Sequence, residues 1–187
     1  MAFPTDTLYG LGVDAFNPKA VQRLFDIKSR TKDMALPLLL ADAHDISSVA
    51  VDVPQMTWDL AKKFLPGPLT ILVQKNASVP DIITAGSSKV AVRVPDHAVP
   101  RSLARELGRP ITGTSANISG EPSATTVSEV VRQLGTTVDF IIDGGPCSGD
   151  IPSTVVDVTE EGLHILREGA ISKAELEEAC GQKVTSQ

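Results

Sequence analysis

The placement of short, β-branched apolar segments constrains the fold of this chain most strongly. Five segments are predicted strands, namely Leu69–Gln74, Lys89–Val94, Val138–Asp143, Thr154–Val158 and Leu163–Leu166, and residues 36–40 are a shorter sixth candidate. Helical patterns separate some of these strands and not others. An α/β chain whose strands and helices do not alternate strictly is predicted to form a twisted, largely mixed sheet flanked by helices, rather than a regular doubly wound fold.

Helical periodicity is found in residues 19–28, 55–64 and 97–107. Two more helices are expected after Thr126 and Ser172, because each hydroxyl is followed three residues later by a glutamate, as in a capping box. No repeat or linker-like tract divides the 187 residues. We therefore expect one domain over residues 1–187, in which Met1–Phe3 is the end of a strand whose beginning is missing.

The overall charge limits the kinds of partner. A formal net charge of −6 argues against a surface built to bind nucleic acid through its phosphates. An anionic ligand must therefore meet a local cluster of cations. Cys147 and Cys180 are far apart and are expected to be free thiols in a reducing cytoplasm. No apolar run reaches the roughly 18 residues of a membrane span, so a cytoplasmic protein without membrane contact is expected.

The segment Pro4–Gly12 concentrates hydroxyls, a carboxylate, a phenol and glycines in nine positions. This density favours a ligand-binding loop that follows a strand. The alternative is a turn stabilised by Asp6 and the glycines. A second polar segment, Gly113–Asn117 with Ser119–Ser123, follows the apolar Ile111 and precedes a capped helix, which is a suitable place for phosphate or ribose.

The basic residues at three separate places suggest a shared anionic ligand. Lys28 and Arg30, with Lys32 close behind, lie at the end of an amphipathic helix, where they form either a triphosphate clamp or favourable charges at the helix end. Arg93 and Arg167 end apolar strands, so each must find an anion, either a structural Asp or Glu or a substrate carboxylate.

Hydrolase and metal chemistry have weaker support. Ser115 lacks the Gly-x-Ser-x-Gly context of a hydrolase nucleophile, and only His44, His97 and His164 could serve as its base. No Cys or His spacing predicts a metal site. Asp14 and Asp143 are isolated carboxylates that could bind magnesium through water. We predict no protein metal ligand.

These segments together resemble the YrdC family of L-threonylcarbamoyladenylate synthases. The resemblance covers almost the whole chain, in the family's order: Phe3–Gly12, Lys28–Arg30, Leu65–Thr70, Val92–His97, Ser115–Asn117, Pro122–Ser123, Ser153–Asp157 and Leu166–Gly169. It implies a YrdC-like fold with a deep concave ligand cavity. The implied activity is the formation of threonylcarbamoyl-AMP from ATP, L-threonine and bicarbonate, with Mg²⁺ accompanying the ATP.

The resemblance also implies the roles of individual residues. L-threonine is expected to contact Thr7, Arg93, Gly113 and Ser153. The nucleotide is expected to contact Lys28, Arg30, Ser115, Asn117, Ser123 and Arg167, of which Lys28 and Arg30 are the expected catalytic cations. The product would pass to a transferase complex that modifies transfer RNA, and the chain itself could contact transfer RNA.

Some features depart from the family pattern. Thr31 and Ala35 stand where prolines are usual, and Leu39 stands where some members have a histidine, so a histidine contact to threonine is not expected. A helix and strand before Pro4 and a longer C-terminal domain, found in relatives, are expected to be missing. Two alternatives stay open, an RNA-binding module without synthase activity and a relative that activates a different carboxylate.

Overall fold

The computed structural model describes residues 1–29, 31, 33–147, 151–159 and 162–186, and their strands form two sheets. The large, seven-stranded sheet has the order β10 (Thr185–Ser186), β9 (Gly162–Arg167), β8 (Thr154–Thr159), β4 (Leu69–Gln74), β5 (Lys89–Arg93), β3 (Leu38–Leu39) and β6 (Ile111–Thr112). It is mixed, because parallel and antiparallel neighbours alternate across it. The predicted mixed sheet is therefore confirmed.

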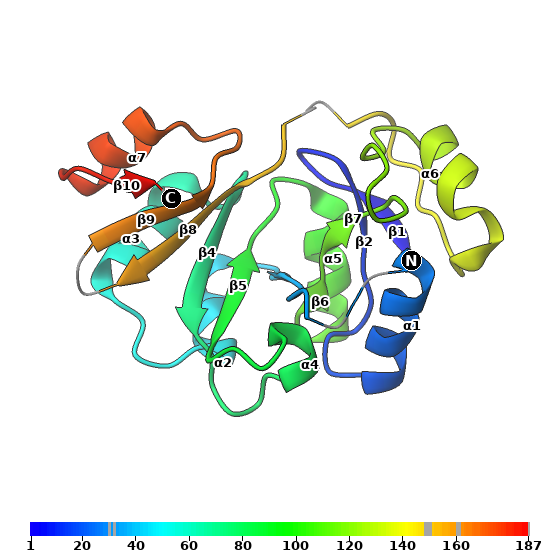
Figure 1. Ribbon diagram of the computed structural model, residues 1–187, viewed down its shortest axis with the longest axis horizontal. Coiled ribbons are helices and arrows are strands. Elements are labelled where there is room, and N and C mark those ends of the chain that lie inside the picture. The colour runs from blue at the N-terminus through cyan, green and yellow to red at the C-terminus, as the bar shows by residue number, and fades with distance from the viewer. Residues whose placement is uncertain (30, 32, 148–150, 160–161, 187) are drawn as a thin grey trace.

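The second sheet is small and antiparallel, and the sequence predicted only its first strand, as the strand end Met1–Phe3. It contains β1 (Ala2–Pro4), β2 (Tyr9–Leu11) and β7 (Thr114–Ser115), in the order β1-β2-β7. Figure 1 shows this sheet beside the large one. The segment Pro4–Gly12 is therefore a hairpin that includes β2, rather than a loop throughout.

The predicted strand Val138–Asp143 is wrong. Ile141 forms only an isolated bridge with Ala2, to which the backbone of Phe140 and Ile142 is also hydrogen-bonded. The side chain of Phe140 is 69% exposed. Val138 is buried in the core, and Ile141 and Ile142 pack against buried residues, so the apolar composition of this segment reflects burial without a continuing strand ladder.

All five predicted helices are confirmed, as α1 (Pro18–Lys28), α3 (Gln55–Phe64), α5 (Ala98–Leu107), α6 (Val127–Leu134) and α7 (Lys173–Cys180). Both predicted capping boxes are present, at Thr126 and at Ser172. Two one-turn helices, α2 (Ile46–Val49) and α4 (Asp81–Thr84), are too short to show a periodicity in the sequence. Within the described residues, every helix is too short or too polar to traverse a lipid bilayer.

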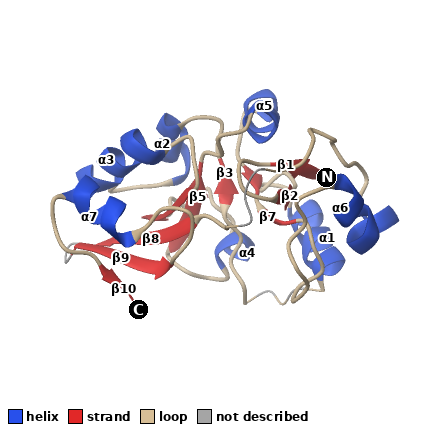
Figure 2. Cartoon of the chain, turned by 90° about the horizontal axis from the view of Figure 1, so that it is seen from above, coloured by secondary structure: helices blue, strands red, loops and turns tan. Residues whose placement is uncertain are grey.

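Helices cover one face of the large sheet, and the one-turn helix α4 lies on the other face, which also forms a wall of the pocket described below. Figure 2 shows α2, α3 and α5 along one side of the sheet and α4 on the opposite side. Leu69 and Ile71 of β4, Val92 of β5 and Val156 of β8 have no exposed surface. Burying such apolar side chains is the main source of stability for a sheet of this kind.

A single glycine connects the two sheets. β6 belongs to the large sheet and β7 to the small sheet, and only Gly113 separates them. A Cβ atom at this position would lie 2.5 Å from Cγ of Leu39, so no larger residue fits without a shift. The backbone N–H of Gly113 donates to the carbonyl of Pro37 at 2.9 Å. The chain therefore passes directly from one sheet into the other at a fixed point.

Candidate functional site

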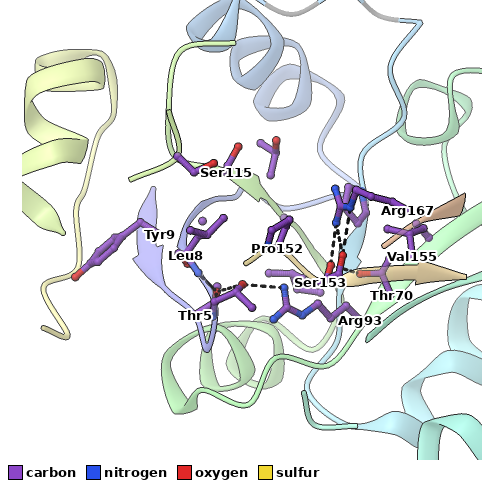
Figure 3. Close-up of a pocket in the computed structure, with 18 of the residues that line it drawn as sticks. Thr5, Leu8, Tyr9, Thr70, Arg93, Ser115, Pro152, Ser153, Val155 and Arg167 are labelled. Carbon is purple, nitrogen blue, oxygen red and sulfur yellow. Dashed lines mark hydrogen bonds between the residues drawn. The ribbon is translucent and has the colours of Figure 1, made fainter. Parts of the chain in front are cut away.

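A pocket of about 520 Å³ lies where the two sheets meet. Residues of β2 and β7 line it from the small sheet, and residues of β3, β4, β5, β8 and β9 line it from the large sheet. This volume is within the range of about 300–1,000 Å³ that is usual for small-molecule sites. Figure 3 shows that Arg93 and Arg167 both approach this space.

Most of the residues predicted to bind a ligand line this pocket. Those that do are Thr7, Arg93, Gly113, Ser115, Ser123, Ser153 and Arg167. Lys28 and Asn117 are buried next to Ser115 and do not line it. Arg30, the other predicted catalytic cation, lies outside the described residues, as does Lys32. Two of the predicted cations, Arg93 and Arg167, therefore converge on one space.

Arg93 is held in one orientation by three neighbouring groups. Its Nε donates to the carbonyl of Gly67 at 3.1 Å, Nη1 donates to Oγ1 of Thr7 at 3.3 Å, and Nη2 donates to Oδ1 of Asp6 at 2.6 Å. The side chains of Arg93 and Asp6 are 10% and 13% exposed. The anion that the sequence required for Arg93 is therefore the carboxylate of Asp6 in this structure.

Thr5 stabilises the turn before β2. Oγ1 of Thr5 accepts hydrogen bonds from the backbone N–H groups of Thr7 and Leu8, both at 3.2 Å, and donates to the carbonyl of Leu8 at 2.7 Å. This leaves the carboxylate of Asp6 directed at Arg93. Gly12 permits a close approach of chains, because a Cβ atom there would lie 2.4 Å from the carbonyl oxygen of Thr112.

Removing the carboxylate of Asp6 should destabilise the protein. We expect Asp6→Ala to lower the free energy of unfolding by about 3 kcal/mol, because the Arg93 charge is then buried without its partner. The free energy is measured by urea denaturation. Asp139→Ala is the control, since Asp139 pairs with Arg23 at an exposed site and should cost less than about 1 kcal/mol. Equal losses in the two variants would show that burial of the Arg93–Asp6 pair has no special energetic effect.

Among the described residues, Arg167 has only neutral hydrogen-bond partners. Its Nε and Nη2 donate to the carbonyl of Ser153 at 3.2 and 2.7 Å, and Nη2 also donates to Oγ of Ser153 at 3.1 Å. Among the described residues, no carboxylate lies within salt-bridge distance of this guanidinium. Burial lowers the pKa of Arg167, and the positive charge of Arg93 lowers it further. The pocket wall thus carries a cation that none of the described carboxylates neutralises and that an anionic ligand can neutralise.

The ammonium group of Lys28 is hydrogen-bonded to protein oxygens next to the pocket. Its Nζ donates to the carbonyls of Ser115 and Asn117 at 2.5 and 2.8 Å, and to Oδ1 of Asn117 at 3.1 Å. These oxygens belong to Ser115 and Asn117 and not to the last turn of α1. The ammonium group of Lys28 therefore does not serve mainly to stabilise the end of that helix. Lys28 would have to release one of them to touch a ligand, and its evident effect is to fix the positions of Ser115 and Asn117.

The alternative of a serine hydrolase has no geometry to support it. Oγ of Ser115 donates to Oδ1 of Asn117 at 2.6 Å, and an amide oxygen is not a general base. None of the described residues that line the pocket is a histidine. Burial raises the pKa of Cys147 and of Cys180, which are both free thiols, so neither is activated as a nucleophile.

Each of the two carboxylates considered for magnesium accepts a hydrogen bond from the backbone N–H group two residues later. Oδ1 of Asp14 accepts from the N–H of Phe16 at 2.9 Å, and Oδ1 of Asp143 accepts from the N–H of Gly145 at 3.0 Å. Neither residue lines the pocket. Throughout the described part of the chain, no three His, Cys, Asp or Glu side chains are grouped so as to hold a metal ion.

Sequence reasoning missed several residues of the site. Thr70, Tyr9 and Pro152 line the pocket, and none was assigned a role. Tyr9 is fully buried and its hydroxyl donates to the carbonyl of Gly145 at 2.8 Å, while burial raises its pKa. Signals existed for Tyr9 and Thr70, since Phe3–Gly12 and Leu65–Thr70 both contributed to the family resemblance.

Comparison with known proteins identifies relatives along nearly the whole chain. Threonylcarbamoyl-AMP synthase of Pyrococcus abyssi (strain GE5 / Orsay) is 40% identical over 182 residues, which are 97% of this chain and 54% of that protein. Threonylcarbamoyl-AMP synthase of Bacillus subtilis (strain 168) is 37% identical over 182 residues, 97% of this chain and 53% of that protein. The chain thus spans about half the length of these curated relatives.

The fold is also found in solved structures. The crystal structure of P. abyssi Sua5 complexed with L-threonine superposes with a TM-score of 0.93 at 40% identity, and the match covers 98% of this chain and 54% of that one. The model of the Sua5/YciO/YrdC family, described as telomere recombination, matches residues 1–169. Sequence and structure therefore agree that this chain belongs to the Sua5/YciO/YrdC family.

Proposed function

We propose that this chain is a nucleotidyltransferase that forms L-threonylcarbamoyl-AMP and pyrophosphate from ATP, L-threonine and bicarbonate. The observation that carries the proposal is the pair of guanidinium groups, Arg93 and Arg167, in one pocket lined by hydroxyl groups. Of these two arginines, only Arg93 has a carboxylate partner among the described residues. The pocket is thus suited to ligands that bring negative charge, as all three substrates do. The names of the two relatives point to the same reaction.

The chemistry requires positioning and charge neutralisation more than covalent catalysis. The threonine amine and bicarbonate lose water to form a carbamate. A carbamate oxygen then attacks the α-phosphorus of ATP, and the bond to the leaving pyrophosphate breaks. Both reactants are anionic, so cations in a site with restricted water access lower the barrier by holding them together. No protein nucleophile is needed.

The amino-acid side of the site is proposed to comprise Thr7, Arg93, Gly113 and Ser153. The fork of Arg93 is already fixed by three acceptors, which leaves two of its five N–H donors for a carboxylate. Pre-set orientation of this kind avoids an entropy loss when the ligand binds. The P. abyssi Sua5 structure contains L-threonine, which supports threonine as the amino acid here.

The nucleotide side is proposed to comprise Ser115, Asn117, Ser123 and Arg167, with Lys28 and Arg30 as the catalytic cations. Lys28 would act through the position of Ser115 and Asn117, or by exchanging one of its carbonyl partners for a phosphate oxygen. Magnesium is proposed to arrive with ATP and to neutralise part of the triphosphate charge. The product would serve a transferase complex that modifies transfer RNA in the cytoplasm, with direct contact to transfer RNA as a further proposal.

The decisive experiment measures pyrophosphate. Purified protein receives ATP, Mg²⁺ and bicarbonate, with or without L-threonine, and we expect pyrophosphate release only when threonine is present. L-Serine and L-valine in place of threonine test whether another carboxylate is activated instead. A steeply salt-dependent affinity for RNA without threonine-dependent pyrophosphate would instead identify an RNA-binding module and overturn the proposal.

A further inference from the structure

Thr70 has no role in the function proposed above, yet it lines the pocket. It belongs to β4, which is located between β5 and β8 in the large sheet. Arg93 ends β5 and Ser153 directly precedes β8, so Thr70 lies between two residues that are proposed to hold the amino acid. Oγ1 of Thr70 is 2.8 Å from Oγ of Ser153, and Figure 3 shows this contact below Arg167.

The hydroxyl groups of Thr70 and Ser153 together have one O–H donor that is not used between them. Oγ of Ser153 accepts from Nη2 of Arg167 at 3.1 Å, and either hydroxyl of the Thr70–Ser153 pair donates to the other. Two hydroxyls carry two protons, and one proton is used between them. Among the described residues, no protein group accepts the second proton. Because both side chains line the pocket, that proton can reach an oxygen atom of a ligand.

We propose that Thr70 and Ser153 act as one hydrogen-bond donor to a carboxylate oxygen of the bound amino acid, and that Thr70 is the positioning residue of this pair. Ser153 of this pair contacts the guanidinium of Arg167, and Thr70 belongs to the strand next to the one that Arg93 ends, so positive charge near the donor favours a carboxylate there. The charge of Arg167 polarises the hydroxyl of Ser153 and strengthens its hydrogen bonds. This inference rests on the proposed function, because it assigns an additional residue to the amino-acid side of the same site.

The test is to remove the Thr70 hydroxyl while retaining its shape. For Thr70→Val we expect the KM for L-threonine to rise about tenfold, as for the loss of one hydrogen bond to a charged group. The KM for ATP should stay within about twofold, because the change concerns only the amino-acid side. Thr70→Ser restores the hydroxyl, and its KM for threonine should return to within about threefold of wild type.

A double-mutant cycle distinguishes one shared donor from two independent ones. If the pair supplies a single donor, Thr70→Val combined with Ser153→Ala should raise the KM for threonine little more than Ser153→Ala alone. Independent donors would instead multiply the two single effects. Multiplication of the effects, or an unchanged KM in Thr70→Val, overturns the inference.

Thr57→Val is the matched control. Thr57 is fully buried in α3, its hydroxyl has no hydrogen-bond partner among the described residues, and it does not line the pocket. Its KM for threonine should equal that of wild type. The two proposals fail in different ways. A wild-type protein without threonine-dependent pyrophosphate release defeats the proposed function, whereas normal wild-type activity with normal kinetics in Thr70→Val defeats this inference alone.

Discussion

Replacing Arg167 with alanine should reduce kcat/KM for pyrophosphate release by about 100- to 1,000-fold, the usual loss when one preorganised donor to a developing charge is removed. The guanidinium faces the pocket without a carboxylate partner among the described residues, so an anionic ligand is its principal electrostatic partner. Steady-state kinetics with varied ATP and threonine measures the effect. Arg167→Lys should recover only part of the activity, since it retains the charge but loses the planar fork.

Stability should respond to Arg167→Ala in a different way. Burial and the nearby Arg93 both disfavour the charged form of Arg167, so the loss of this side chain should change the free energy of unfolding by less than about 1 kcal/mol. Arg105→Ala is the matched control, because Arg105 shares Asp42 with Arg101 away from the pocket. It removes the same charge and should leave kcat/KM unchanged. Equal activity losses in the two variants would mean that only the net charge matters.

Gly169→Ala should damage both stability and activity. A Cβ atom at Gly169 would lie 2.4 Å from the carbonyl oxygen of Pro152 and 2.5 Å from the backbone nitrogen of Thr154. Backbone cannot yield as a flexible side chain can, so we expect a loss of about 3 kcal/mol in the free energy of unfolding. Ser153 lies within the displaced segment, and its hydrogen bonds with Arg167 and Thr70 should be disturbed. At least a 100-fold loss of kcat/KM is expected.

Gly108→Ala provides the comparison for this change. Gly108 follows α5 with a φ of 70°, and a Cβ atom there would meet nothing within 4 Å. Only the left-handed backbone conformation is penalised, which costs about 1 kcal/mol. Thermal and urea denaturation of both variants, together with their kinetics, decide the matter. Comparable stabilities would contradict the steric argument for Gly169.

The sequence predicted the elements that have a period or a cap, and missed those that have neither. α3 and β4 begin and end at the predicted residues because ten and six residues suffice to show their patterns. β2 and β7, which were missed, have three and two residues, and such strands exist only because they pair with their neighbours. β1 was predicted as the strand end Met1–Phe3. The pairing of β2 and β7 depends on tertiary contacts, which a local sequence pattern cannot predict.

The same distinction applies to the site. A charged residue at the end of an apolar strand needs a partner, so Arg93 and Arg167 could be selected from the sequence alone. The kind of partner could not be predicted. Asp6 is 87 residues from Arg93 in sequence, and Thr70 is 83 residues from Ser153. The sequence left a structural acid and a ligand open for both arginines, and the structure assigns the acid to Arg93 and none of the described acids to Arg167.

The direct passage of the chain through Gly113 also sets a length. In the proposed function, Gly113 contacts the amino acid and Ser115 contacts the nucleotide, and these residues are two positions apart on one extended segment. An extended chain advances roughly 3.3 Å per residue, so covalent bonds hold the two contact points roughly 7 Å apart. Small movements between the two sheets leave this spacing unchanged. The distance between the amino-acid contact and the nucleotide contact is therefore set by the backbone of this segment, and it does not depend on how the two sheets pack.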